Sequence, residues 1–164
     1  MSVIDDYRKF GDDGKAEFLR HLEFEEIPEK WRLLHAVIAD PNEYDLARMQ
    51  ALKILEIASI PAEQLQSFCE LLVSVIKTDQ DYDVKNYAVM ASKNFINDSD
   101  ALQTLIVDIV LDAKEDIDIR HNAYEAVLAF FDIAGLKAVL EKLSSDEEMG
   151  RYARSDLAQY HSDD

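Results

Sequence analysis

Hydrophobic and polar residues follow one another along this chain with the period of an α-helix. Between residues 62 and 77 the apolar side chains recur at spacings of three and four residues, which places them on one face of a helix: Leu65, Phe68, Cys69, Leu72, Val73 and Ile76. Residues 99–113 repeat the pattern with Leu102, Leu105, Ile106, Ile109 and Val110. Alternation typical of strands never persists, and no Asn-Gly or Asp-Gly pair joins two apolar runs. The pattern predicts an all-α fold.

Proline and capping residues indicate where the helices begin and end. Pro28 and Pro61 suit the first position of a helix, where no amide hydrogen is needed. Ser99 and Asp132 suit N-caps, and Pro41 follows the end of a helix. The sequence therefore predicts ten helices, at residues 2–10, 13–23, 28–39, 44–58, 61–77, 82–96, 99–113, 117–131, 133–144 and 146–160.

A short motif recurs at the start of several of these helices. Residues Asp83–Ala88 read Asp-Val-Lys-Asn-Tyr-Ala, and residues Asp118–Ala123 read Asp-Ile-Arg-His-Asn-Ala. Each copy has a further acid two residues before it, Asp81 or Asp116, and Asp45–Ala51 is a looser copy. The base of the motif recurs about every 36 residues, which indicates a repeat of two helices.

These motifs resemble the first-helix signature of HEAT and HEAT-like repeats. The resemblance implies a HEAT-like α-solenoid of about four to five stacked helix pairs, because one helix pair cannot bury its apolar face alone. We expect one such domain over residues 1–164, with the clearest repeats at 40–145. Residues 1–39 and 146–164 are then divergent or capping helices.

The acids of the motif admit two interpretations. Asp79, Asp81 and Asp83 begin like a calcium-binding loop, but Val84 stands where that loop requires glycine, and Met90 where it requires glutamate. The better interpretation is that Asp81, Asp83, Asp116 and Asp118 cap helix N-termini, where the helix dipole favours negative charge. We expect Lys85 and Arg120 to pair with acids of neighbouring repeats.

Composition limits the classes of partner. The chain has 17 Lys and Arg against 34 Asp and Glu, a formal net charge of −17, and a hydrophobic fraction of 48% that is ample for a core. Such a charge opposes direct binding to nucleic acid or to an anionic membrane. Cys69 is the only cysteine and the N-terminus carries no signal-peptide pattern, so we expect a cytoplasmic protein.

No pattern in the sequence predicts a catalytic centre, a metal site or a cofactor. The four histidines are scattered, and the chain has no Gly-x-Ser-x-Gly elbow, glycine-rich phosphate loop or Cys-x-x-Cys pair. Cys69 occupies an apolar position of its helix, as expected of a small core residue rather than a nucleophile. We therefore expect a protein that is not an enzyme.

The second helices of the repeats carry exposed acids that capping does not explain. We expect Glu63, Glu70, Asp100 and Asp108 to contact a basic protein partner, with Tyr82 as an aromatic anchor. In size, charge and architecture the chain resembles immunity proteins of bacterial contact-dependent, or polymorphic toxin, growth-inhibition systems. That resemblance implies a protein that covers the substrate cleft of a cognate basic toxin domain, such as a nuclease.

Other functions remain open at this point. The same acids would keep any solvated surface soluble, which fits a general HEAT-repeat scaffold or adaptor. An enzyme on a HEAT-like solenoid, such as a bilin lyase, would need a ligand cleft whose residues the sequence does not reveal. A DNA-repair glycosylase would need a basic groove, which the net charge of −17 opposes.

Overall fold

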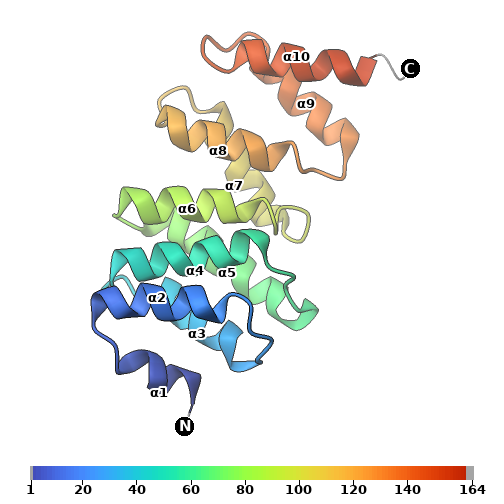
Figure 1. The fold of residues 1–164 in the computed structure, drawn as a ribbon. Helices are drawn as coiled ribbons and strands as arrows, with labels where there is room; N and C mark the ends of the chain where they lie inside the picture. The colour runs from blue at the N-terminus through green and yellow to red at the C-terminus, as the bar shows by residue number, and fades with distance from the viewer. Residues whose placement is uncertain (1, 162–164) are drawn as a thin grey trace.

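The structure is a computed structural model that describes residues 2–161, and within this range it contains ten α-helices and no strand (Figure 1). The helices are α1 (Val3–Arg8), α2 (Asp12–Leu22), α3 (Glu29–Ala39), α4 (Asp45–Ile57), α5 (Ala62–Thr78), α6 (Tyr82–Ser92), α7 (Asp100–Leu111), α8 (Ile117–Val127), α9 (Ile133–Leu143) and α10 (Gly150–His161). The all-α class and each of the ten expected helices are confirmed.

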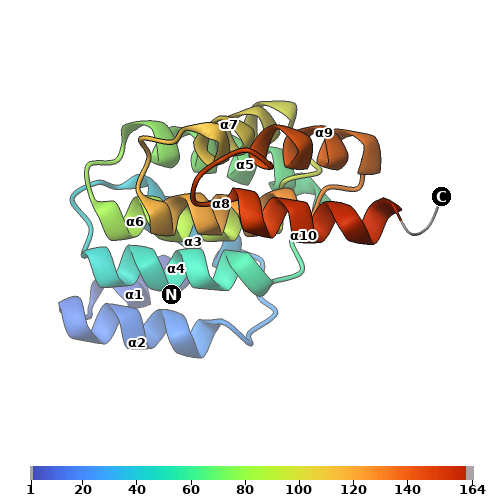
Figure 2. The same ribbon diagram turned by 90° about the horizontal axis from the view of Figure 1, so that it is seen from above.

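The helices form two layers that follow the order of the chain. In the even layer α2 packs against α4, α4 against α6 and α6 against α8, with α10 above them (Figure 1). In the odd layer α3 packs against α5, α5 against α7 and α7 against α9, and α5, α7 and α9 are seen together in Figure 2. Helix α1 covers α3 at the N-terminal end of the stack. This packing of neighbouring helix pairs is consistent with a small α-solenoid.

The loops gather at two edges of the stack. The turns that lead from an odd to an even helix lie on the left in Figure 1, and we call this the junction edge. The turns that lead from an even to an odd helix lie on the right, and we call this the loop edge. The core lies between the layers, where the aromatic rings of Trp31, Phe68 and Phe95 follow one another with centroids 6.3 and 6.1 Å apart.

Three helices differ from the predicted bounds by four residues, about one turn: α10 begins at Gly150 instead of residue 146, and α6 and α8 end early. Helix α6 ends at Ser92 instead of residue 96, and α8 ends at Val127 instead of residue 131. Tight turns follow α6 and α8, and hydrogen bonds to neighbouring helix pairs hold them: after α8, the Asn97 side chain donates to the Ala129 carbonyl oxygen and accepts from the Phe131 amide, at 2.8 and 2.9 Å. The Asn94 amide nitrogen donates to the carbonyl oxygens of Leu55 and Ala58, each at 2.8 Å, and so satisfies the C-terminal end of α4.

A base at the fourth residue of each even helix from α2 to α8 pairs with an acid at the following junction. These pairs form what we call the base–acid ladder: Lys15–Glu43 at 2.6 Å, Arg48–Asp79 at 2.5 Å, Lys85–Glu115 at 2.9 Å and Arg120–Asp146 at 2.6 Å. The expectation that Lys85 and Arg120 pair with acids of neighbouring repeats is confirmed. The ladder also extends to α2, through the Lys15–Glu43 pair, which the sequence motif did not predict; we call each pair of the ladder a rung.

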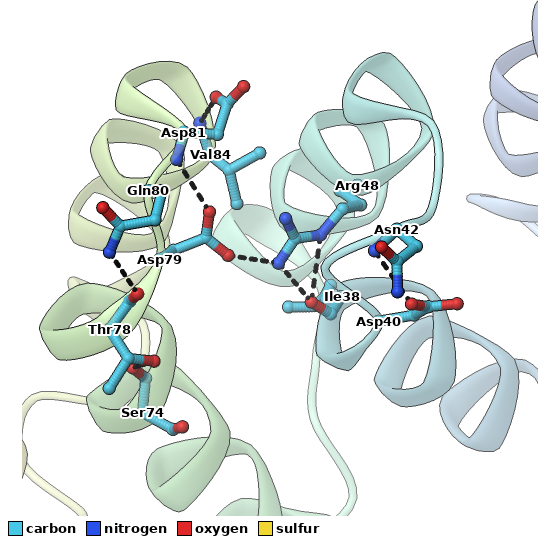
Figure 3. A network of polar contacts seen from close by, with 10 residues as sticks. All are labelled: Ile38, Asp40, Asn42, Arg48, Ser74, Thr78, Asp79, Gln80, Asp81 and Val84. Atoms are coloured by element: carbon cyan, nitrogen blue, oxygen red, sulfur yellow. Dashed lines mark hydrogen bonds and ion pairs between the residues drawn. The ribbon is translucent and has the colours of Figure 1, made fainter.

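The two arginine rungs are buried and make additional hydrogen bonds. Arg48 donates from Nε and Nη2 to the carbonyl oxygen of Ile38, at 3.2 and 2.8 Å, as well as to Asp79 (Figure 3). Arg120 makes the same two bonds to Val110, at 3.1 and 2.9 Å. Each guanidinium therefore joins the C-terminal end of an odd helix, the next even helix and the following junction.

Acids at the junctions also cap the even helices. Asp81 accepts from the Val84 amide at 2.9 Å, and Asp116 accepts from the amide of its second neighbour, Asp118, also at 2.9 Å. The capping interpretation is therefore confirmed for Asp81 and Asp116. Asp83 and Asp118 lie inside the first turn instead, where their charges face the positive end of the helix dipole.

We expect Arg120→Ala to destabilise the protein by about 3–5 kcal/mol, because it leaves the Asp146 carboxylate without its cation and the Val110 carbonyl without its donors. Urea denaturation followed by circular dichroism measures the loss. Arg32→Ala is the matched control, since Arg32 is exposed on α3, and we expect a change within about 0.5 kcal/mol. Equal losses in the two variants would contradict a structural role for the ladder.

The Arg120–Asp146 pair also predicts a pH dependence of stability. Burial opposes ionisation of Asp146, but hydrogen bonds from Arg120 and from the following amides outweigh it, so the pKa of this carboxyl lies below its ordinary value. The pair therefore stabilises the fold above the unfolded-state pKa near about 4, and this contribution is lost as the pH falls through the folded-state pKa.

We accordingly expect the stability difference between the native protein and Asp146→Asn to be largest near about pH 7 and to shrink as the pH drops below about 4. Comparing the two proteins at each pH cancels the titration of the other acids. Urea denaturation midpoints across this range measure the difference. A stability difference that stays constant with pH would show that ionisation of Asp146 contributes nothing.

Candidate functional site

The outer surface of α5 and α7 carries the acids that the sequence singled out. Both helices turn an apolar face towards the even layer, where Phe68, Leu72 and Ile106 are fully buried, so their polar positions face outwards. Four predicted contact residues are exposed on these two helices: Glu63, Glu70, Asp100 and Asp108. The structure therefore leaves all four accessible to a partner.

Two adjoining grooves run between α5 and α7 and meet at Ala101. One measures about 480 Å³ and is lined by Gln66, Glu70, Asp98 and other residues, and the second measures about 320 Å³ and is lined by Lys77, Asp100, Thr104 and Asp108 among others. We call Gln66, Glu70, Lys77, Asp98, Asp100 and Asp108 the α5–α7 surface. Sequence analysis missed Asp98, because it lies in the turn before α7, outside the helical pattern.

The carboxylates of this surface differ from those of the ladder in having no counter-ion among residues 2–161. Glu70, Asp98, Asp100 and Asp108 form no ion pair with any residue of the described chain. Glu70 accepts one hydrogen bond, from the amide of Gln66 at 3.0 Å. A single ammonium group, that of Lys77, lines the same grooves. The α5–α7 surface is therefore negative and keeps its hydrogen-bond acceptors available.

Tyr82 lies apart from this surface. It begins α6 in the even layer, at the junction edge, and its side chain is 45% exposed. Its hydroxyl donates to Asp116 at 2.8 Å, and this hydrogen bond, with a smaller effect of burial, raises the pKa of Tyr82 to about 12. The structure thus does not bring Tyr82 together with Asp100 and Asp108, and its hydroxyl already has a partner in the next repeat.

Glu63 also lies outside the α5–α7 surface. It stands at the first turn of α5 and lines a separate groove together with the loop between α2 and α3. Of the five predicted contact residues, Glu70, Asp100 and Asp108 therefore line one continuous surface, while Glu63 and Tyr82 do not.

The α5–α7 surface offers the acceptors that arginine and lysine side chains bind with charge-assisted hydrogen bonds. Within residues 2–161, no group of three or more His, Cys, Asp or Glu side chains is arranged to hold a metal ion, and no helix is long and apolar enough to cross a membrane. No protein-family model, curated protein or solved structure matches this chain. The function is therefore inferred from the side chains themselves.

Cys69 lines the groove that contains Glu70, but its thiol is unreactive by position. The side chain is 2% exposed, and burial, with smaller effects of Asp98 and Glu70, raises the pKa of the thiol to about 11. About one thiol in a thousand is then ionised at pH 8, and only the thiolate attacks.

We expect alkylation of Cys69 in the folded protein to be at least about 100-fold slower than alkylation of a free cysteine, and unfolding in urea to restore the free rate. Reaction with iodoacetamide followed by mass spectrometry measures both rates. Rapid modification of the folded protein would contradict the buried position and reopen a role for Cys69 as a nucleophile.

Proposed function

We propose that this chain is a HEAT-like repeat protein that acts as an immunity protein, binding a cognate basic toxin domain and blocking its substrate cleft. The observation that carries the proposal is the α5–α7 surface, where Glu70, Asp98, Asp100 and Asp108 have no counter-ion within the described chain. A cationic partner would supply the counter-ions that the fold does not.

The mechanism is stoichiometric inhibition. A nuclease cleft is lined by lysine and arginine side chains that bind phosphate oxygens, and carboxylate oxygens can accept hydrogen bonds from the same groups. Carboxylates that follow α5 and α7 would thus occupy the positions of phosphates and exclude the nucleic acid. The net charge of −17 also steers a cationic protein towards the surface and raises the association rate at low salt.

The base–acid ladder supports this role by holding the surface rigid. Ladder contacts fix successive even helices at the junction edge, and the odd helices α5 and α7 pack against α6 and α8. The carboxylates are therefore arranged before the partner arrives, so that little conformational entropy is lost on binding. A flexible acidic tail would lack this advantage.

The candidate partner is the product of the gene next to the one that encodes this chain. We expect the two proteins to form a one-to-one complex that weakens as salt is added. We also expect this chain to protect cells from the toxicity of that product. In the double variant Asp100→Lys/Asp108→Lys we expect the association rate constant at low salt to fall by about tenfold or more, because the steering charge is reversed at the contact. Surface plasmon resonance over a range of salt concentrations measures the rates.

The matched control is Asp83→Lys/Glu125→Lys, which reverses two exposed acids of the even layer and changes the net charge by the same amount. We expect its association rate constant to stay within about twofold of the native value. Equal losses in both variants would show that net charge alone drives association. No binding of the adjacent gene product, even at low salt, would refute the proposal.

A further inference from the structure

A second groove lies at the loop edge, between the loop that joins α2 to α3 and the loop that leads into α5. It measures about 580 Å³. We call it the loop-edge groove, and its lining includes Glu23, Phe24, Glu25, Glu26, Ile27, Pro28, Lys30, Trp31, Pro61 and Glu63. The groove therefore combines aromatic and aliphatic side chains with four carboxylates, and it is separate from the α5–α7 surface.

Phe24 gives the groove an exposed aromatic side chain. It is 84% exposed in the loop after α2, although burying a phenylalanine side chain is worth about 2–3 kcal/mol. Ile57 at the end of α4, which precedes Ala58 of the groove lining, is 70% exposed. The Trp31 ring forms part of the lining and is held by an edge contact with Phe68, at 6.3 Å between centroids. A partner side chain that covered Phe24 would gain this unused apolar area.

The net charge of the side chains around Phe24 is negative. Glu23, Glu25, Glu26 and Glu63 line the groove, and none of them forms an ion pair with another residue of the described chain. Glu23 precedes Phe24 in the chain and Glu25 and Glu26 follow it, so the groove is complementary to an apolar side chain with cations before and after it.

Lys30 also lines the groove, but its ammonium group is hydrogen-bonded to the backbone of the loop between α2 and α3. The side chain is 6% exposed, and its Nζ donates to the carbonyl oxygens of Glu23 at 2.5 Å and Glu25 at 3.3 Å. Burial lowers the pKa of this amine. Lys30 therefore holds the loop in place, so the groove is formed before a ligand binds. Its charge attracts Glu23, Glu25 and Glu26 without an ion pair to any of them, and four carboxylates outnumber this one ammonium group in the groove.

We propose that the loop-edge groove is a docking site for an extended lysine- or arginine-rich segment of a partner protein. One apolar side chain of the segment packs against Phe24 and Trp31, and the cations on either side of it pair with the surrounding glutamates. The site goes beyond the inhibitory role of the α5–α7 surface and does not depend on it. Nucleic acids and anionic membranes are unsuited to the groove, because they carry the charge of its own carboxylates.

Trp31 is the only tryptophan of the chain, and its place in the groove makes it a reporter of binding there. The probe is a synthetic peptide of lysine and arginine residues around one central leucine, without aromatic residues and with a fluorescent label at its end. We expect it to shift the emission of Trp31 saturably at low salt, in parallel with the anisotropy of the label. The same peptide with glutamate in place of its cations should cause no shift.

Three variants separate this site from general charge attraction. We expect Phe24→Ala and Glu25→Gln/Glu26→Gln each to weaken peptide binding by about tenfold. The first variant removes the apolar contact, and the second removes two carboxylates that pair with the cations of the peptide. Asp100→Asn/Asp108→Asn removes the same charge from the α5–α7 surface, and we expect its affinity to stay within about twofold. Phe24, Glu25 and Glu26 are exposed, so these substitutions leave the core intact.

Two results would overturn the proposal. One is a peptide that binds, by anisotropy, without moving the Trp31 emission, which would place it elsewhere on the molecule. The other is an equal loss of affinity in the two charge variants, which would show that the net charge alone drives peptide binding. Both results concern the loop-edge groove alone. The proposed function of the α5–α7 surface is tested separately, by binding to the product of the neighbouring gene.

Discussion

A cation at each junction between helix pairs, buried where it is Arg48 or Arg120, is the interaction on which the rest of the structure depends. Burial of apolar faces can stack helices, but it is non-directional and does not by itself fix which turn of one helix meets which turn of the next. Arg48 and Arg120 supply that direction, because each joins a carbonyl oxygen ten residues earlier to an acid of the following junction. A shift of one turn would leave a buried charge without partners, and this makes the stacking order specific.

The base of the ladder is arginine in two of its pairs and lysine in the other two, and all four join an even helix to the following junction. Arginine donates to both a carbonyl and a carboxylate, whereas the lysine rungs make a single ion pair and are more exposed. Near the start of α10, Gly150 stands three residues before Ala153, where the motif has its base three residues before its alanine. Arg154, one turn later, donates to the carbonyl oxygen of Ser144 instead. A Cβ atom on Gly150 would lie 2.8 Å from that oxygen and 2.9 Å from the arginine Nη1, so glycine leaves room for the substitute.

The sequence predicted those parts of the molecule that depend on local pattern. The ten helices follow from apolar spacing, and the Lys85 and Arg120 rungs follow from two copies of one motif. The Lys15 rung was missed because its helix begins Asp-Asp-Gly and lacks the motif's β-branched residue. The ends of α6 and α8 depend on hydrogen bonds between repeats, such as those of Asn94, and no local pattern encodes them. The loop-edge groove needs loops from two repeats and is visible only in three dimensions.

The net charge of −17 therefore has parts with different physical roles. Ladder and capping acids are compensated by bases or helix dipoles and contribute to stability. The uncompensated acids repel one another, which costs stability in the isolated protein. Two of them lie on α5, the longest helix of the described residues at 17 residues, which presents Glu63 to the loop-edge groove and Glu70 to the α5–α7 surface. A cationic partner that follows α5 would relieve this repulsion at both sites, so binding and stabilisation of the fold should be coupled.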